Sequence, residues 1–132
     1  MADSLQVDLV SPERRLLSTE ARQVQIPGME GELTAMPNHA PFLTTLRPGI
    51  VRVVSGSDTS EYVVTGGFAE ISPTAATILA EQAVLRGEES AEMFEELAKD
   101  ADAARSDAPD DERRAADQRV RDVARLRSEL GK

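Results

Sequence analysis

The chain has 132 residues and a formal net charge of −9, with 24 acidic residues against 15 Lys and Arg. This length suits one compact domain, or a small domain with an appendage. The acidic balance excludes a general attraction to nucleic acid or anionic lipid, and four aromatic residues are too few for a base-stacking platform. The lack of cysteine excludes disulfides, thiolate metal sites and Cys nucleophiles.

The chain opens on Met1, Ala2 and Asp3, without a basic start followed by an apolar run. We therefore expect neither a signal peptide nor an Arg-rich transit peptide. No apolar segment approaches the ~20 residues needed to cross a bilayer. The sequence predicts a cytosolic protein, or one held at a membrane only through partners.

The composition changes near Gly87. Residues 1–87 contain seven of the eight glycines and six of the seven prolines, whereas Ala, Glu, Asp and Arg dominate residues 88–132. The first composition favours strands and the second favours helices. We expect a boundary here, between an N-terminal β-domain (1–87) and a C-terminal helical domain (88–132).

Short apolar segments in the first part alternate with turn residues, which is typical of an antiparallel sandwich or barrel. The segments predicted as strands are 5–9, 22–26, 50–54, 61–65, 68–71, 76–80 and 83–85. Residues 28–49 instead hold Pro37, Pro41 and Pro48. Because proline fixes the backbone, this segment predicts a rigid loop for docking, or a plain connection over the core.

Two apolar stripes of helical period follow. The first contains Met93, Phe94, Leu97, Ala98 and Ala101, and the second contains Ala116, Val120, Val123, Leu126 and Leu130. Ser90 is a plausible N-cap, and a break at 106–109 predicts a two-helix hairpin. Since alanine buries little area, we expect the hairpin to be weakly held and able to detach.

The second predicted helix carries the basic surface of the chain, at Arg113, Arg114, Arg119, Arg121, Arg125 and Arg127. One interpretation is a solvated face with i,i+4 pairs such as Asp117–Arg121. The other is a contact for an acidic partner.

Residues suited to catalysis are scarce. The single histidine, His39, cannot form a multi-histidine metal site and is more plausible in a structured loop than as a general base. Gly66 and Gly67 lack the phosphate-loop pattern, so we expect them to allow close backbone approach or to relieve a bulge.

Several motifs resemble the epsilon subunit of bacterial F-type ATP synthases. The family pattern G-E-L, P-G-H-A-P and L-x-P-G is similar to Gly31-Glu32-Leu33, Pro37-Asn38-His39-Ala40-Pro41 and Leu46-Arg47-Pro48-Gly49. Matching features flank them at Val10-Ser11-Pro12-Glu13, Thr65-Gly66-Gly67 and Leu79-Ala80-Glu81. The resemblance covers at least residues 5–87.

This resemblance implies an N-terminal β-sandwich of about ten strands, a C-terminal two-helix hairpin, and a rotor subunit without catalytic activity. It implies docking of the gamma subunit onto the c-ring, coupling proton flow to ATP synthesis at the cytoplasmic face of the bacterial inner membrane. Glu32 matches a ring contact, and His39 lies in a docking loop. The partner-binding residues expected are Glu32, Met36, Pro37, Asn38, His39, Ala40, Pro41 and Phe42.

The C-terminal part departs from the family. Many members carry I/L-D-x-x-R-A, whose Asp and Arg help to bind ATP. The best match, residues 93–98, places Phe94 and Leu97 at those positions, so we expect no cofactor and no tight ATP binding. By resemblance, the six arginines of the second helix could contact the alpha and beta subunits and inhibit hydrolysis.

Two other classes of function compete with this interpretation. One is a free-standing ligand- or peptide-binding sandwich with a helical dimerisation tail. The other is a small acid–base enzyme that uses His39, which requires a concave pocket and a nearby carboxylate.

Overall fold

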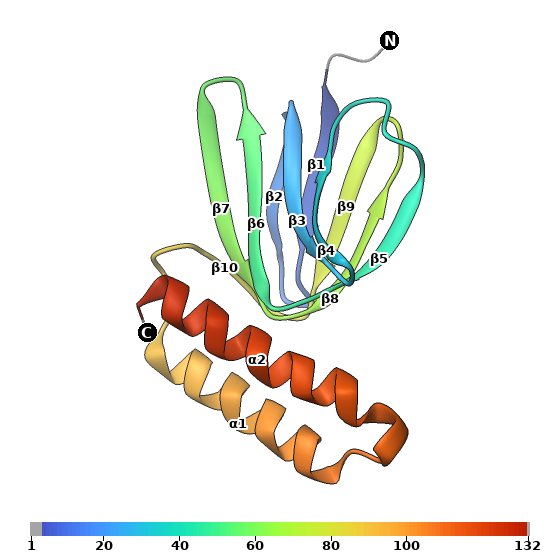
Figure 1. The fold of residues 1–132 in the computed structure, drawn as a ribbon. Helices are drawn as coiled ribbons and strands as arrows, with labels where there is room; N and C mark the ends of the chain where they lie inside the picture. Colours follow the sequence, from blue (N-terminus) through green and yellow to red (C-terminus); the bar gives the residue numbers. More distant parts are fainter. Residues whose placement is uncertain (1–3, 132) are drawn as a thin grey trace. The chain divides into compact units, whose positions relative to one another are not determined.

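The computed structural model describes residues 4–131. Residues 1–3, on which the expectation about leader peptides partly depends, lie outside this range. The chain divides into two compact units, Met1–Gly87 and Glu88–Lys132. Within the described residues the first unit is built of strands and the second of helices (Figure 1).

The strands form one continuous hydrogen-bonded sheet that folds into two layers. In chain order, the strands of the described range are β1 (Leu5–Val10), β2 (Arg15–Ala21), β3 (Gln23–Gly28), β4 (Gly31–Ala35), β5 (Phe42–Leu46), β6 (Gly49–Ser55), β7 (Asp58–Val64), β8 (Gly67–Ile71), β9 (Ala75–Ala80) and β10 (Ala83–Leu85). The strand order is β10-β7-β6-β3-β5-β8-β9-β1-β2, with β4 paired to β3. The predicted β-sandwich is therefore confirmed.

The two layers join through a single residue pair between β3 and β5, Gly28 opposite Leu46. At the other edge, Arg22 donates its backbone N–H to the carbonyl of Val54, which brings the β2 end against β6. One pairing differs from an all-antiparallel sheet, because β1 runs parallel to β9. This pairing is possible because many residues separate the two strands, whereas a tight hairpin forces antiparallel neighbours.

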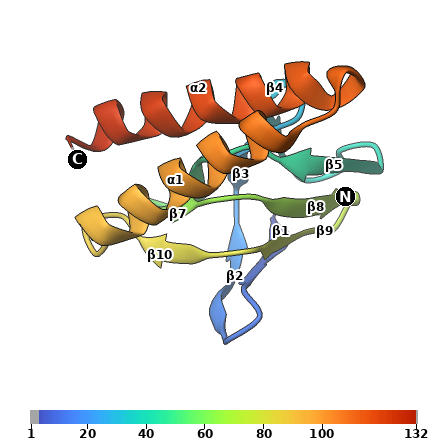
Figure 2. The same ribbon diagram turned by 90° about the horizontal axis from the view of Figure 1, so that it is seen from below.

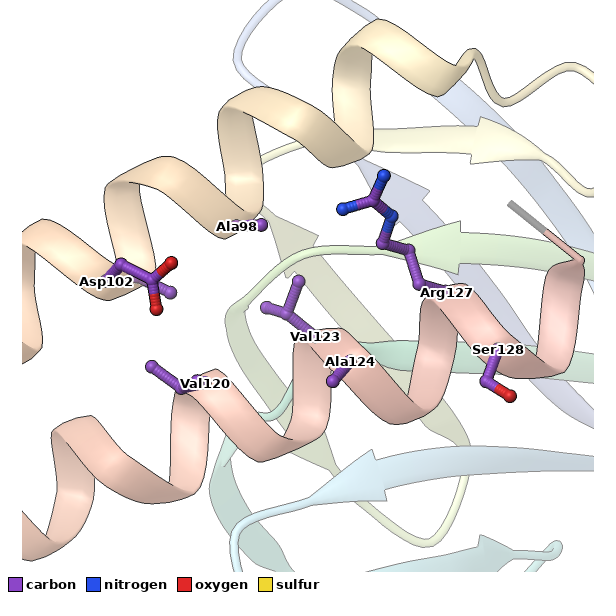
Figure 3. Close-up of a pocket in the computed structure, with 8 residues that line it drawn as sticks. Ala98, Asp102, Val120, Val123, Ala124, Arg127 and Ser128 are labelled. Carbon is purple, nitrogen blue, oxygen red and sulfur yellow. The ribbon is translucent and has the colours of Figure 1, made fainter.

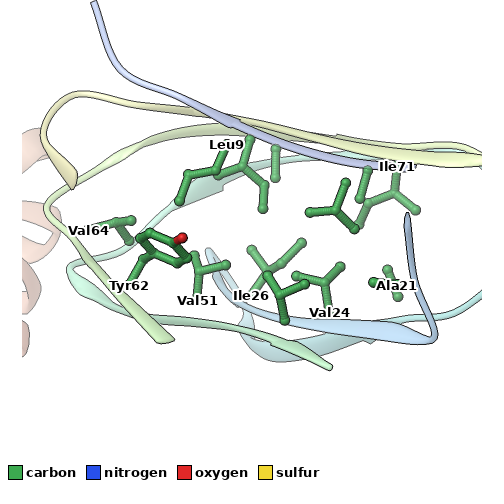
Figure 4. Close-up of a cluster of buried hydrophobic side chains, with 14 of the residues drawn as sticks. Leu9, Ala21, Val24, Ile26, Val51, Tyr62, Val64 and Ile71 are labelled. Carbon is green, nitrogen blue, oxygen red and sulfur yellow. The ribbon is translucent and has the colours of Figure 1, made fainter. Parts of the chain in front are cut away.

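The core lies between the layers. In β1 the inward positions Leu5, Val7 and Leu9 are buried while the alternate residues are partly exposed, as the period of two predicts. Ile26 of β3 and Val51 of β6 meet them from the opposite layer (Figure 4).

Residues 28–49 differ from the predicted loop, because they contain two strands. β4 pairs with β3 from Val24–Ala35 to Gly28–Gly31, and β5 pairs along β8. Prolines suppressed the strand signal, yet each lies just outside β4 or β5, where no ladder hydrogen bond is needed. β2 also escaped prediction because its apolar residues, Leu16 and Leu17, are adjacent and do not alternate.

Gly67 allows β8 and β9 to approach closely, as expected from the sequence. Its φ is +128°, and a Cβ atom there would lie 2.0 Å from the carbonyl oxygen of Leu79. Only glycine fits this combination of backbone angle and distance.

The second unit is a helical hairpin, as predicted. α1 (Ala91–Asp107) and α2 (Arg113–Leu130) lie side by side and are joined through the short 3-10 turn η1 (Asp110–Glu112) (Figure 2). Ser90 is the N-cap, and its hydroxyl accepts from the N–H of Met93 at 3.1 Å. Among residues 4–131, no helix has the length and apolar character needed to cross a membrane.

Candidate functional site

The β3–β4 hairpin places Glu32 near a two-residue turn formed by Met29 and Glu30. Gly28 and Gly31 flank the turn as an opposed pair. The N–H of Met29 donates to the hydroxyl of Thr44 at 3.1 Å, which holds the turn against β5. Glu32 is exposed on β4. This end of the sandwich therefore presents the carboxylate of Glu32 and the thioether of Met29 on a fixed backbone.

The loop from Met36 to Phe42 connects the opposite end of β4 to β5. Asn38 has φ +71° and donates its backbone N–H to the carbonyl of Pro73 at 2.7 Å. The resemblance has glycine at this position, and asparagine is among the few residues that tolerate such an angle. His39 donates its backbone N–H to the carbonyl of Met36, which closes the turn.

The ring of His39 has a defined hydrogen-bonding role. Its Nδ1 lies 2.6 Å from the carbonyl oxygen of Ala40. Because a carbonyl can only accept, Nδ1 must carry the proton. The ring therefore helps to shape its own loop, between the exposed Ala40 and Pro41 and the turn at Asn38.

The structure thus brings Met36, Pro37, Asn38, His39, Ala40, Pro41 and Phe42 together but separates them from Glu32. Three residues of β4 lie between Glu32 and Met36, so the two side chains are four positions apart, or about 13 Å of extended chain. The two predicted contacts lie toward opposite ends of β4.

An apolar patch that the sequence analysis did not single out lies on the outer face of β5, β8 and β9. We call Leu43, Phe68 and Leu79 the outer patch; each is more than half exposed. Phe68 pairs directly with Leu79, and Leu43 lies on the adjoining strand β5, two positions from Thr45, the partner of Phe68. The sequence signal was weak, because the outer phase of these strands mixes Phe68 and Leu79 with the polar Glu70 and Thr77.

The opposite layer carries a polar network on its outer face. Glu61 accepts from Arg52 at 2.8 Å and from Arg86 at 3.2 Å, and Arg52 also donates to Gln25. Hydrogen bonding from Arg52, strengthened by the charges of Arg52 and Arg86, holds the pKa of Glu61 below its ordinary value against the opposing effect of burial.

The arginines of α2 are partly engaged within the hairpin. Asp117 pairs with Arg105 of α1, and not with Arg121 as predicted; Arg121 donates to Gln118 instead. Arg125 pairs with the buried Asp122 at 3.2 Å. Arg113 and Arg114 are exposed at the start of α2, and Arg119 also makes an interaction.

Arg127 belongs to a groove along the hairpin, with a cavity volume of about 390 Å³. Ala98, Ala101 and Asp102 line it from α1, and Val120, Val123 and Arg127 are among the residues that line it from α2. The Arg127 side chain extends toward α1 (Figure 3). Small side chains leave this groove unfilled.

Apolar side chains that lie together on an exposed surface, as in the outer patch, indicate a site of contact with another protein. Comparisons with known proteins identify the family of this chain. Residues 4–86 match the family described as ATP synthase, Delta/Epsilon chain, beta-sandwich domain. An ATP synthase epsilon chain of Fuscovulum blasticum is 59% identical over 106 residues, covering 80% of this chain and 82% of that one. The epsilon chain of Rhodobacter capsulatus is 57% identical over 108 residues, covering 79% and 82%.

Solved structures show the same fold across most of the chain. A chain of the Euglena gracilis mitochondrial ATP synthase superposes with a TM-score of 0.73 at 22% identity, covering 98% of this chain and 83% of that one. A chain of the Tetrahymena thermophila mitochondrial ATP synthase, in a structure of its central stalk and c-ring, gives 0.63 at 18% identity, covering 92% and 94%.

The chain therefore belongs to the ATP synthase delta/epsilon family, as the motifs indicated. It is accordingly a non-catalytic subunit of the ATP synthase, in the rotor stalk of the complex. Neither an enzyme based on His39 nor a free-standing ligand-binding sandwich is favoured.

Proposed function

We propose that this subunit couples the gamma subunit to the c-ring through two separate surfaces of its sandwich. The observation that carries the proposal is the separation of Glu32 from the Met36–Phe42 loop at opposite ends of β4. A protein that transmits torque between two partners needs two contact areas that do not overlap. A β-sheet with a packed core is stiff enough to pass force between them.

The gamma-binding surface in this proposal combines the Met36–Phe42 loop with the outer patch, which runs along the outer sheet face from Leu43, next to the loop, to Phe68 and Leu79, nearer the end where Leu46 opposes Gly28. Phe68 and Leu79 are paired side chains on the same exposed sheet face as Leu43. Covering such a patch removes apolar area from water, at about 25 cal/mol per Å². The loop adds a shaped edge that its turn hydrogen bonds keep in place.

The ring-binding surface in this proposal is the β3–β4 turn with Glu32. Its backbone is held by the pairing with β3 and by the bond from Met29 to Thr44. An exposed carboxylate on a fixed strand is suited to polar loops of a partner, and charge at an interface edge mainly sets orientation and association rate.

Binding of purified gamma subunit and of c-ring to surface variants tests both assignments. Replacing Phe68 and Leu79 together by alanine should weaken gamma binding at least about tenfold, because hydrophobic contacts at an interface centre dominate affinity. Leu85→Ala, on an exposed leucine of β10, is the matched control and should leave binding unchanged.

For the ring, Glu32→Lys should reduce binding while Glu13→Lys, an exposed acid of the β1–β2 turn, should not. Equal loss in both glutamate variants would show a general charge effect and remove the assignment of Glu32. Unchanged gamma binding after loss of the outer patch would remove the gamma surface.

By this proposal the protein works as a peripheral subunit at the cytoplasmic face of the bacterial inner membrane, coupling proton flow to ATP synthesis. Fractionation of membranes should recover it with gamma and the ring. Recovery in the soluble fraction of cells with intact synthase would contradict this location.

We also propose that the hairpin contacts the alpha and beta subunits through its exposed arginines. The exposed Arg113 and Arg114 support this, since they begin α2 and face solvent. Deleting residues 88–132 should raise the ATPase rate of the assembled synthase, and an unchanged rate would overturn the regulatory role.

Finally, we propose that the hairpin does not bind ATP tightly. The support is chemical, because Phe94 and Leu97 stand where the resemblance has charged residues, and both are buried in α1. An NMR titration with ATP should give no saturation below millimolar concentration, and sub-millimolar saturation would contradict this.

A further inference from the structure

Two methionines stand out among the exposed side chains of the sandwich. Met29 is 59% exposed and Met36 is 52% exposed, although methionine usually lies in protein cores. Met93 of α1, in contrast, is only partly exposed. The chain has no cysteine, so its thioethers are the sulfur atoms that a two-electron oxidant can reach.

The positions of the two methionines follow β4. Met29 lies in the β3–β4 turn beside Glu32, and Met36 begins the Met36–Phe42 loop at the other end. Each proposed docking surface therefore carries one exposed thioether. A thioether suits an interface because it is apolar and adapts its shape to the partner.

We infer that Met29 and Met36 are sites of oxidation to methionine sulfoxide by hydrogen peroxide, and that each sulfoxide weakens one docking contact. The docking half of this inference rests on the proposed function. Oxidation at Met29 should affect the ring contact, and oxidation at Met36 should affect the gamma contact.

The chemistry balances with the peroxide as sole co-reactant. The thioether sulfur attacks one peroxide oxygen, an S–O bond forms, the O–O bond breaks, and water leaves after proton transfer. Sulfur loses two electrons and the peroxide gains them. The product is a polar sulfoxide in place of an apolar side chain, and such a change disrupts methionine-bearing interfaces.

Accessibility sets the order of reaction. Because a thioether must meet the oxidant, exposed methionines react before those shielded by neighbouring side chains. Met29 is anchored only through its backbone N–H, so its side chain stays free at the turn. Met36 likewise contributes its backbone carbonyl to the His39 turn while its side chain is exposed.

The test begins with the intact chain treated with hydrogen peroxide and analysed by peptide mass. Met29 and Met36 should gain one oxygen atom each before Met93 does. Equal or slower oxidation at Met29 and Met36 would overturn the site assignment. Met1 is read in its own N-terminal peptide and does not interfere.

The second readout is binding of gamma subunit and c-ring by the oxidised chain. Met29→Leu leaves Met36 as the exposed site, Met36→Leu leaves Met29, and leucine preserves volume and apolar character. With Met29→Leu, oxidation should lower gamma affinity at least about tenfold and spare the ring; Met36→Leu should show the reverse. Binding of gamma and of the ring by the double leucine variant should not change on peroxide treatment.

The outcomes separate the two ideas. If the untreated chain binds gamma and ring but oxidation changes neither affinity, the inference fails while the proposed function stands. If the untreated chain binds neither partner, the proposed function fails, and the inference that oxidation weakens docking fails with it. The peptide masses still decide whether Met29 and Met36 are the oxidation sites.

Discussion

The sandwich and the hairpin are stabilised in different ways. In the sandwich, strands far apart in the sequence pair side by side, as Gln6 does with Ala75 across β1 and β9. Its core consists of branched aliphatic side chains such as Val24, Ile26 and Ile78, all fully buried. In the hairpin, α1 and α2 are neighbours in the sequence, and alanines line much of their shared groove.

This difference has consequences for how each unit responds to change. In a close-packed sheet core, one truncated side chain leaves a cavity that the surroundings cannot fill. Helical hairpins depend on many small local contributions, such as caps and ion pairs, each worth a fraction of the total. The sandwich is therefore suited to presenting a surface of fixed shape, and the hairpin is suited to changing its conformation.

The largest effect is expected from Ile78→Ala in the sandwich core. Removing this fully buried side chain should lower the free energy of unfolding by about 3 kcal/mol. Leu79→Ala is the matched control, since Leu79 points outward on the same strand, and should cost less than about 1 kcal/mol. Tyr62, the one tyrosine of the chain, is buried in the sandwich and reports this transition in chemical denaturation.

Similar losses for the two substitutions would contradict the division into inner and outer faces. That result would mean that Leu79 is covered in the isolated chain and unavailable for docking.

Gly67→Ala should have the next largest effect, about 2 kcal/mol or more, because it combines a positive φ with a collision against Leu79. Gly56→Ala provides the comparison, since Gly56 also has positive φ, +62°, but open space around it. It should cost about 1 kcal/mol. A Gly56 loss as large as that at Gly67 would assign both effects to backbone angle alone.

Much of the sandwich was predictable from alternation. Strands with one apolar face, such as β1, can be recognised in the sequence because buried and partly exposed positions follow a period of two. β4 and β5 did not, since prolines flank them and the segment has the composition of a loop. The parallel pairing of β1 with β9 was unpredictable, because no local signal states which distant strand lies alongside.

The candidate site was predictable in its residues but not in its geometry. The resemblance supplied Glu32 and the Met36–Phe42 loop as a contact region, yet their separation depends on the register of β4 against β3. The outer patch was missed because Phe68 and Leu79 were assigned to strands without asking which face each residue occupies. The ion pair between Asp117 and Arg105 joins two helices, so it depends on how α1 and α2 pack. Residue spacing within one helix cannot predict such a pair.

Ser90→Ala tests whether the stability of the hairpin depends on local interactions such as helix caps. Loss of the cap to the Met93 N–H should destabilise α1 by about 1 kcal/mol, measured by hydrogen exchange of its first-turn amides. The Tyr62 transition should not move. A shift of that transition equal to the change in α1 would show that the two units unfold as one and are not stabilised independently.

The smallest effect is expected at Glu61, where the contribution depends on pH. The pKa of Glu61 is lowered in the folded protein, chiefly by the hydrogen bond from Arg52 and further by the charges of Arg52 and Arg86. The resulting stabilisation is therefore present at neutral pH, above the unfolded pKa, and is lost as pH falls through the folded value. Glu61→Gln should cost at most about 1 kcal/mol at neutral pH, because the pair is partly exposed.

Denaturation of both proteins across this pH range gives the measurement. The difference between wild type and Glu61→Gln should shrink on acidification, and it should also be small in an Arg52→Gln background, where the main donor is absent. A difference that persists at low pH would assign the loss to packing of the Glu61 side chain. The stability of the sandwich would then depend on close packing even at its outer polar face. At that face, a partly exposed ion pair is expected to tolerate substitution as readily as the contacts of the hairpin do.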